Sequence, residues 1–276
     1  MDVSFCGTRG SLPTPGRGTL RYGGNTSCVW VSTEGWNLVL DAGSGIQHLG
    51  KTLANAPGRI DILLTHLHMD HIQGLGFFSP LFQPNRDIHI WGPPSTTRTL
   101  RRRLARYLSP PLFPVRVGDL PARLTCHDAP REIMELGPFR VRAELICHPD
   151  PTIGYRIACG GTALTYMPDH EPQLGRRSLP RAEWLSGFNL AEGTDLLIHD
   201  AQYTPEEYAQ RVGWGHCTAE LAVQFGEIVG VKRLALFHHD PDHSDEFIDA
   251  TVLKLNNGTA RDFRVFAAAE GQSLVL

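Results

Sequence analysis

The sequence predicts an α/β fold in which two mixed sheets pack face to face with helices outside. Two observations lead to this prediction. β-Rich segments fill both halves of the 276-residue chain, and each half also contains helical segments. The run at 60–64 is apolar almost throughout, which suits a strand buried on both faces. Because no repeat, low-complexity tract or long linker interrupts the chain, we expect one domain spanning 1–276.

The individual elements follow from local patterns. Short apolar, β-branched segments bounded by glycine, proline or acidic turns predict strands, and segments with helical periodicity and helix-start signals predict helices. The expected strands are 3–6, 28–32, 37–40, 60–64, 88–91, 139–147, 154–159, 163–167, 196–199, 234–237 and 263–266. The expected helices are 46–53, 95–108, 205–211, 217–229 and 244–255.

Composition limits the compartment and the partners. The formal net charge of −3 provides no overall attraction for a polyanion, so any phosphate binding must come from local basic groups. The six cysteines are scattered without a Cys-x-x-Cys pair, which favours reduced thiols. The start has no basic leader, and no run of about eighteen apolar residues occurs. We therefore expect a cytoplasmic protein that does not enter a membrane.

A cluster of potential metal ligands directly follows the apolar run. His66, His68, Asp70 and His71 offer three imidazoles and a carboxylate within six residues. These are donors that Zn²⁺ binds, and the end of a buried strand holds side chains rigidly. The alternative is a histidine-rich surface loop, but gathering four such groups at a strand end without a ligand carries a desolvation cost.

The segment His-x-His-x-Asp-His resembles the signature of the metallo-β-lactamase superfamily. The resemblance implies a four-layer αβ/βα sandwich with the metals at one edge. It also implies further ligands after later strands, which fall on His148, on Asp169 as a bridging carboxylate, and on His238, with His239 as the alternative. Asp41 matches an aspartate that supports a ligating histidine, although it also suits a turn or a helix cap.

The resemblance implies two divalent metal ions as cofactors. Ions about 3.5 to 4 Å apart can hold a bridging hydroxide and polarise a substrate oxygen. The ligand types rank Zn²⁺ first, with Mn²⁺ and Fe²⁺ as alternatives.

A second segment, Gly213-Trp214-Gly215-His216-Cys217-Thr218, indicates the branch and the reaction. Its histidine resembles the extra histidine of the phosphodiesterase branch, which includes tRNA 3′-processing nucleases of the RNase Z type and small-molecule cyclic phosphodiesterases. We therefore expect His216 to be the general acid, assisted by Asp70, which would contact both a metal and the attacking water. A helix-capping role for His216 is the alternative.

The expected substrate is a small or cyclic phosphodiester. The RNase Z type usually carries a long arm between the residues corresponding to His148 and Asp169, whereas here 154–167 reads as a plain hairpin. Nucleic acid is therefore possible but not favoured. The glycine-rich N-terminal loop, with Arg9 and Asn25, either approaches an anion or holds a sharp turn.

Several roles stay open at this level. The arginines Arg98, Arg101, Arg102, Arg103 and Arg106 either bind phosphates or form a solvated helix face. A homodimer is possible, as in relatives of this type. The rival functions are a thioesterase or lactamase, which would not need His216; a flavodiiron oxidoreductase, which usually has glutamate in place of His68; and a non-enzymatic scaffold, which would have lost ligands.

Overall fold

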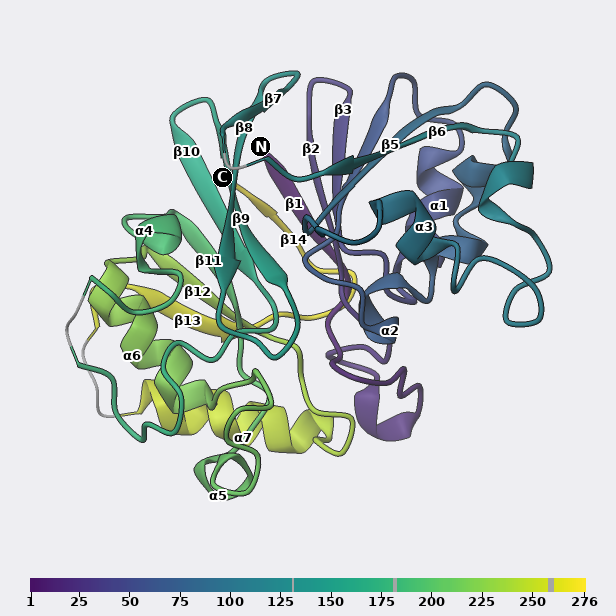
Figure 1. Ribbon diagram of the computed structural model, residues 1–276. Coiled ribbons are helices and arrows are strands. Elements are labelled where there is room, and N and C mark those ends of the chain that lie inside the picture. The colour runs from purple at the N-terminus through teal and green to yellow at the C-terminus, as the bar shows by residue number, and fades with distance from the viewer. Residues whose placement is uncertain (131, 181–182, 258–260) are drawn as a thin grey trace.

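The computed structural model describes residues 1–130, 132–180, 183–257 and 261–276. In this part of the chain, two seven-stranded sheets lie face to face (Figure 1). The first sheet has the order β14 (Ser273–Val275), β1 (Asp2–Gly7), β2 (Cys28–Thr33), β3 (Trp36–Leu40), β4 (Ile60–Leu63), β5 (Asp87–Gly92) and β6 (Arg123–Asp128). The second has the order β13 (Arg264–Ala267), β12 (Arg233–Phe237), β11 (Leu196–Asp200), β10 (Thr162–Met167), β9 (Thr152–Cys159), β8 (Phe139–Ile146) and β7 (Met134–Leu136).

Helices cover both outer faces of the sandwich (Figure 1). The described residues form the helices α1 (Ile46–Leu53), α2 (Met69–Ile72), α3 (Leu100–Leu104), α4 (Phe188–Ala191), α5 (Pro205–Tyr208), α6 (Ala219–Val229) and α7 (Asp245–Asn256). Apolar residues of α1 and α3 pack on the first sheet, and those of α4 and α6 pack on the second. The arrangement confirms the predicted four-layer α/β sandwich.

The two sheets share one apolar core. Phe5 of β1 packs with Phe237 of β12, and Tyr155 of β9 lies fully buried between the sheets. Burial of such large side chains is the main favourable term that holds the layers together, at roughly 25 cal/mol per Å² of apolar surface. The core therefore fixes the first sheet against the second, and with it the relative positions of their strand ends.

Local expectations and the structure differ most around α3. The predicted helix 95–108 is wrong in extent, because α3 spans only Leu100–Leu104. The Thr99 hydroxyl accepts a hydrogen bond from the Arg102 amide and so caps the helix late, and Ala105 ends it. Strands β6, β7 and β14 were not predicted. β7 and β14 have only three residues each, and β6 is rich in polar residues, so all three depend on pairing with a neighbouring strand.

The segment between β8 and β10 matters for the site. β9 pairs antiparallel with both β8 and β10, and the turn between β9 and β10 contains only Gly160 and Gly161. The predicted plain hairpin is confirmed, so no arm extends from this segment.

No helix in the described parts of the chain is both long and apolar enough to cross a bilayer.

Candidate metal centre

The end of β4 is held by a buried carboxylate. Asp41, whose backbone φ of 58° is left-handed, accepts a hydrogen bond from the Thr65 amide at 2.7 Å. It also accepts hydrogen bonds from the hydroxyls of Thr65 and Tyr166. These contacts join the two sheets at the point where the chain turns from β4 into the histidine-rich segment.

Three histidines form what we call the open group: His66, His68 and His148. Their potential ligand atoms lie within 4.8 Å of one another. His66 is buried, whereas the His68 side chain is 44% exposed. The His68 Nε2 lies 2.9 Å from Asp150 Oδ2, which leaves Nδ1 for the centre. The open group therefore has one side facing solvent.

Four further residues form the enclosed group: Asp70, His71, Asp169 and His238. Their potential ligand atoms also lie within 4.8 Å of one another, and all four residues are buried. Asp70 and His71 come from α2, while Asp169 follows β10 and His238 follows β12. The seven residues predicted as metal ligands thus converge in two adjacent groups, and His238 rather than His239 belongs to them.

Asp169 lies between the two groups. Its Oδ2 is 3.7 Å from Nε2 of both His66 and His148. Its Oδ1 is 3.0 Å from His71 Nε2 and 3.4 Å from His238 Nε2. One carboxylate oxygen therefore faces each group, which is the arrangement required of a carboxylate that bridges two cations.

The hydrogen-bonding pattern tests whether these residues fit metal ions. Nε2 of His66, His71 and His148 and Oδ1 of Asp169 are buried and have no hydrogen-bond partner among the described residues. Leaving such polar atoms unpaired is unfavourable by about 1–3 kcal/mol each. One cation in each group would satisfy these atoms, so the donor set fits a dinuclear centre.

The second ring nitrogen of each histidine in the two groups is already occupied. Nδ1 of His66 lies 3.1 Å from the Thr65 hydroxyl, and Nδ1 of His71 lies 2.7 Å from Asp41 Oδ2. His148 uses the Thr152 hydroxyl at 2.9 Å, and His238 uses Gln202 Oε1 at 3.1 Å. Such partners fix the orientation and tautomer of a metal-ligating imidazole. Neither Thr152 nor Gln202 was expected from the sequence.

For His66, His148 and Asp169, the electrostatics favour the protonation states that bind cations. His71 differs, because burial lowers its pKa but the carboxylates of Asp169, Asp70 and Asp41 raise it well above its usual value. Burial lowers the pKa of His66 well below its usual value and that of His148 to about 4, so both rings are neutral. Burial alone would raise the pKa of Asp169, but the neighbouring His238 and His71 outweigh it and hold that pKa well below its usual range. Metal binding requires neutral imidazole and ionised carboxylate.

His216 lies at the edge of the same centre. Its ring stacks on that of His238 at 4.9 Å, and its Nδ1 lies 2.6 Å from Asp200 Oδ2. Burial lowers the pKa of His216, but Asp200 raises it more, to about 9. The other ring nitrogen, Nε2, is thereby left to act as a proton donor. The capping alternative is wrong, because Thr218 caps α6 by accepting a hydrogen bond from the Leu221 amide.

Asp200 was not singled out from the sequence. A signal was present, however, because Asp200 ends the buried strand β11, as His238 follows β12 and Asp169 follows β10. In the structure Asp200 also accepts a hydrogen bond from the Cys217 amide at 3.0 Å. It therefore positions both the backbone and the side chain of the segment that carries His216.

Two glycines allow the chain to approach the ligands closely. A Cβ atom on Gly10 would lie 2.4 Å from the His238 ring, and one on Gly215 would lie 2.2 Å from the His148 ring. Any side chain at either position would displace a ligand. The glycine-rich N-terminal loop therefore packs directly against the centre.

Arg9 and Asn25 hold this loop in place. The fully buried Arg9 donates hydrogen bonds to the carbonyls of Gly23, Asp240 and His243, and Asn25 donates one to Glu270. These contacts match the expected turn-holding role, and Arg9 points away from the ligands.

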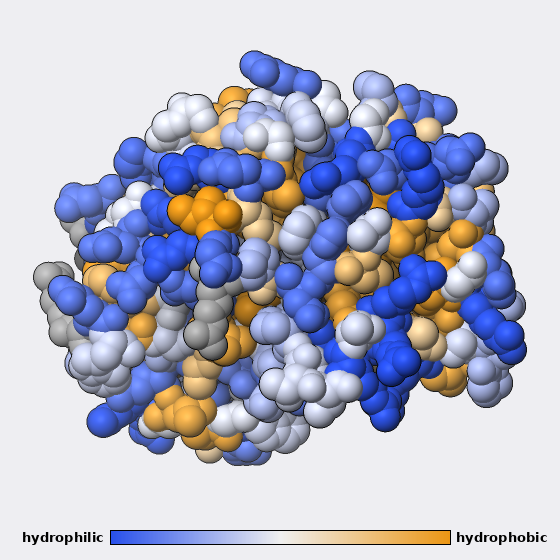
Figure 2. All heavy atoms as spheres, turned by 45° about the horizontal axis from the view of Figure 1, so that its top comes forward, coloured by the Kyte–Doolittle hydropathy of each residue, from blue (hydrophilic) through white to orange (hydrophobic). Residues whose placement is uncertain are grey.

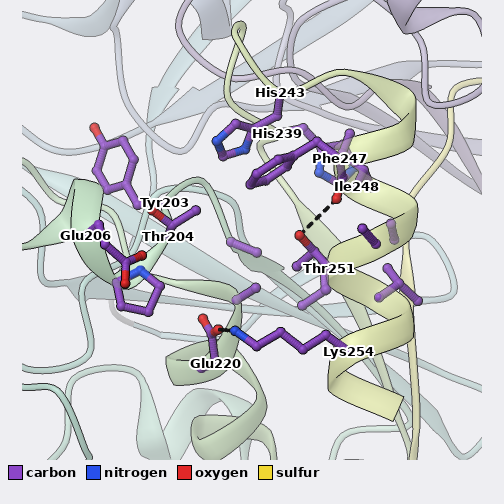
Figure 3. Close-up of a pocket in the computed structure, with 17 residues that line it drawn as sticks. Tyr203, Thr204, Glu206, Glu220, His239, His243, Phe247, Ile248, Thr251 and Lys254 are labelled. Atoms are coloured by element: carbon purple, nitrogen blue, oxygen red, sulfur yellow. Dashed lines mark hydrogen bonds and ion pairs between the residues drawn. The ribbon is translucent and has the colours of Figure 1, made fainter. Parts of the chain in front are cut away.

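His239 lines a separate cavity. Its Nε2 lies 2.9 Å from the Ala268 carbonyl oxygen. Figure 3 shows His239 beside His243 and Phe247, in a cavity of about 250 Å³ bordered by α7. Consecutive residues after β12 thus point to different places, and the one that reaches the centre is His238, which has a left-handed φ of 61°.

The comparisons with known proteins agree with this site. A family model for the beta-lactamase superfamily domain matches residues 36–239. The fold and the histidine–aspartate cluster define a metal-dependent hydrolase, and the chain belongs to the metallo-β-lactamase superfamily. Within that superfamily it is similar to the Ribonuclease Z-like branch.

Relatives of this branch match along nearly the whole chain. The Ribonuclease Z of Brevibacillus brevis is 29% identical over 285 positions, which cover 89% of this chain and 87% of that protein. The Ribonuclease Z of Rippkaea orientalis is 27% identical over 322 positions, covering 96% and 97%. Human tRNase Z, short form, has a similar fold, with a TM-score of 0.67, 24% identity and coverage of 100% and 99%. Because the 322 positions exceed the length of this chain, the second relative contains segments that this chain lacks.

Proposed function

We propose that this protein is a dinuclear phosphodiesterase, with zinc as the first candidate metal. The observation that carries the proposal is Asp169, which presents one oxygen to each of two ligand groups while the His216–Asp200 pair lies at the same edge. Lactamase or thioesterase chemistry would not need that histidine. Two cations held by these groups would polarise a phosphodiester and lower the pKa of a water molecule.

The residues of the chain supply positioning and a proton. Asp70 Oδ2 accepts a hydrogen bond from the Ser11 amide at 2.8 Å and lies 3.2 Å from His238 Nε2, so its carboxylate is fixed in the centre. His216 donates a proton from Nε2 to the departing oxygen of the diester. Asp200 keeps the imidazole oriented and favours its protonated form.

Two substrate classes are supported by different observations. The plain β9–β10 hairpin leaves no arm to hold a large folded RNA, which supports a small or cyclic phosphodiester. The Ribonuclease Z relatives support RNA instead. A short RNA strand satisfies both observations, because it needs no arm to reach an open metal centre.

The test is metal analysis and a diesterase assay on the same preparation. We expect about two divalent ions per chain and hydrolysis of bis-p-nitrophenyl phosphate. A parallel screen of cyclic nucleotides, short RNA and a thioester separates the substrate classes. Protein that holds two metal ions but cleaves only the thioester would disprove the phosphodiesterase proposal and leave the fold assignment intact.

A further inference from the structure

The region around α3 has a charge unlike that of the rest of the chain. Residues 88–118 contain six arginines and no acidic residue, whereas the whole chain has a net charge of −3. Arg98, Arg101, Arg102, Arg106 and Arg116 are exposed. Strongly hydrophilic side chains, with apolar ones between them, are exposed on the right of the molecule in Figure 2, the side on which Figure 1 draws α3.

These arginines are not neutralised by neighbouring carboxylates. Of these six arginines, Arg103 is the one that forms an ion pair within the described residues, with Asp128 at 3.3 Å. Arg101 donates weak hydrogen bonds to the carbonyls of Leu124 and Val117, at 3.3 and 3.4 Å, which fix its position. An exposed basic stretch without counter-charges produces a local positive potential that attracts anions.

Three of the arginines share a concave site, which we call the arginine pocket. Arg101, Arg102 and Arg116 line a depression of about 380 Å³ together with Leu108, Ser109 and Val117. No carboxylate is among its lining residues, although Asp119 is close in sequence. Guanidinium groups match the geometry of phosphate oxygens, so the chemistry of the pocket is that of a phosphate site.

Helix α3 connects this pocket to the metal centre. On one side it contributes Arg101 and Arg102 to the arginine pocket, and on the other Arg103 to a cleft of about 520 Å³. That cleft also contains His68 and Asp150, the exposed edge of the open group. The five-residue helix is only about 7.5 Å long, so the two sites are adjacent.

We infer that the arginine pocket binds the phosphate backbone of an RNA strand whose cleaved phosphodiester lies at the metal centre. The inference rests on the proposed phosphodiesterase function and specifies its substrate class. A single small diester could not occupy the cleft and the pocket at once, whereas successive phosphates of one strand can. Five unpaired arginines spread over 98–116 also suit a polyanion better than one phosphate group.

The test uses the metal-loaded full chain and a fluorescent 2′-O-methyl RNA oligonucleotide that resists cleavage. In the variant Arg102→Gln/Arg116→Gln, we expect RNA affinity to fall about tenfold at 0.1 M salt. The slope of log affinity against log salt should fall in magnitude by about 1.4, since each single-strand phosphate contact contributes roughly 0.7. Arg102→Lys/Arg116→Lys should keep most of that slope, because it keeps the charge.

The matched control is Lys51→Gln/Arg140→Gln, which removes two exposed positive charges on α1 and β8. We expect this control to bind RNA like the unmodified protein, and both glutamine variants to keep the unmodified melting temperature. An equal loss of RNA affinity in the control would overturn the inference. So would an unchanged affinity in Arg102→Gln/Arg116→Gln, or displacement of the RNA by a mononucleotide at a similar concentration.

Activity separates this inference from the proposed function. Arg102→Gln/Arg116→Gln should cleave bis-p-nitrophenyl phosphate at the unmodified rate while losing about tenfold in kcat/KM for unmodified RNA. Failure of the unmodified protein to cleave the small diester would disprove the proposed function, but arginine-dependent RNA binding would still be measured. Normal diester cleavage with arginine-independent RNA binding would overturn only the inference.

Discussion

The two ligand groups differ in how far the protein encloses them. Side chains of the enclosed group are at most 8% exposed, and its His71 is fixed by the buried Asp41. In the open group His68 is 44% exposed, and its partner Asp150 is 67% exposed. The enclosed group is therefore shielded from solvent, whereas His68 brings the open group to the end of a cleft where a substrate can arrive. From this difference we expect the enclosed group to contribute more to stability and the open group more to substrate access.

The largest expected effect comes from removing the carboxylate that the two groups share. Asp169→Asn should reduce the metal content from about two ions to fewer than one and lower hydrolysis to that of metal-stripped protein, because both groups lose a charged ligand. Metal analysis and the diesterase assay measure this. Asp87→Asn is the control, because Asp87 begins β5 and lies at the strand end opposite to the one that carries the ligand groups. Two retained ions in Asp169→Asn would show that the groups do not depend on a shared ligand.

The next effect tests the proton donor beside the enclosed group. His216→Ala should lose roughly 10²- to 10⁴-fold in turnover while keeping its metal content, the usual contribution of a positioned general acid. His243→Ala, which removes a histidine paired with Glu207 in the separate cavity, should stay active. The assay uses one diester with a good leaving group and one with a poor leaving group. If His216→Ala cleaves both at near-normal rates, His216 only packs against His238 and is not the proton donor.

Substituting one acidic residue beside each group compares how strongly the two groups depend on their carboxylate partners for metal affinity. Asp41→Asn should weaken metal binding by about 10- to 100-fold, because it disturbs the partner of a buried ligand. Asp150→Asn alters the partner of the exposed His68. Because water can replace that partner, the variant should lose less metal affinity than Asp41→Asn. Titration against a competing chelator gives both affinities. Equal losses would mean that enclosure does not distinguish the two groups.

The smallest effect concerns the stability of the metal-free protein. His71→Ala should lower the free energy of unfolding by about 1–3 kcal/mol, because the buried Asp41 loses a hydrogen-bond partner. His68→Ala should change it by less than about 0.5 kcal/mol, as expected at an exposed position. Denaturant unfolding in the presence of a chelator compares the two variants. A greater loss in His68→Ala would contradict the assignment of stability to the enclosed group.

Much of the site could be predicted because its residues follow strand ends. His66, His68, Asp70 and His71 are adjacent in the chain, so their clustering needs no tertiary information. His148, Asp169 and His238 were expected only through the resemblance to a known family. Asp200 obeys the same strand-end rule but was overlooked, since a single acid at the end of a strand has many ordinary roles.

By itself, the sequence determined the fold class and one local set of metal ligands, because apolar periodicity and short spacing act within a few residues. Only the tertiary structure decided which oxygen of Asp169 faces which histidines, that His238 rather than His239 enters the centre, and that Asp200 holds His216. It also decided that Arg116 joins Arg101 and Arg102 in one pocket. These relations join residues far apart in the chain, and they depend on how the sheets and the segments between their strands pack.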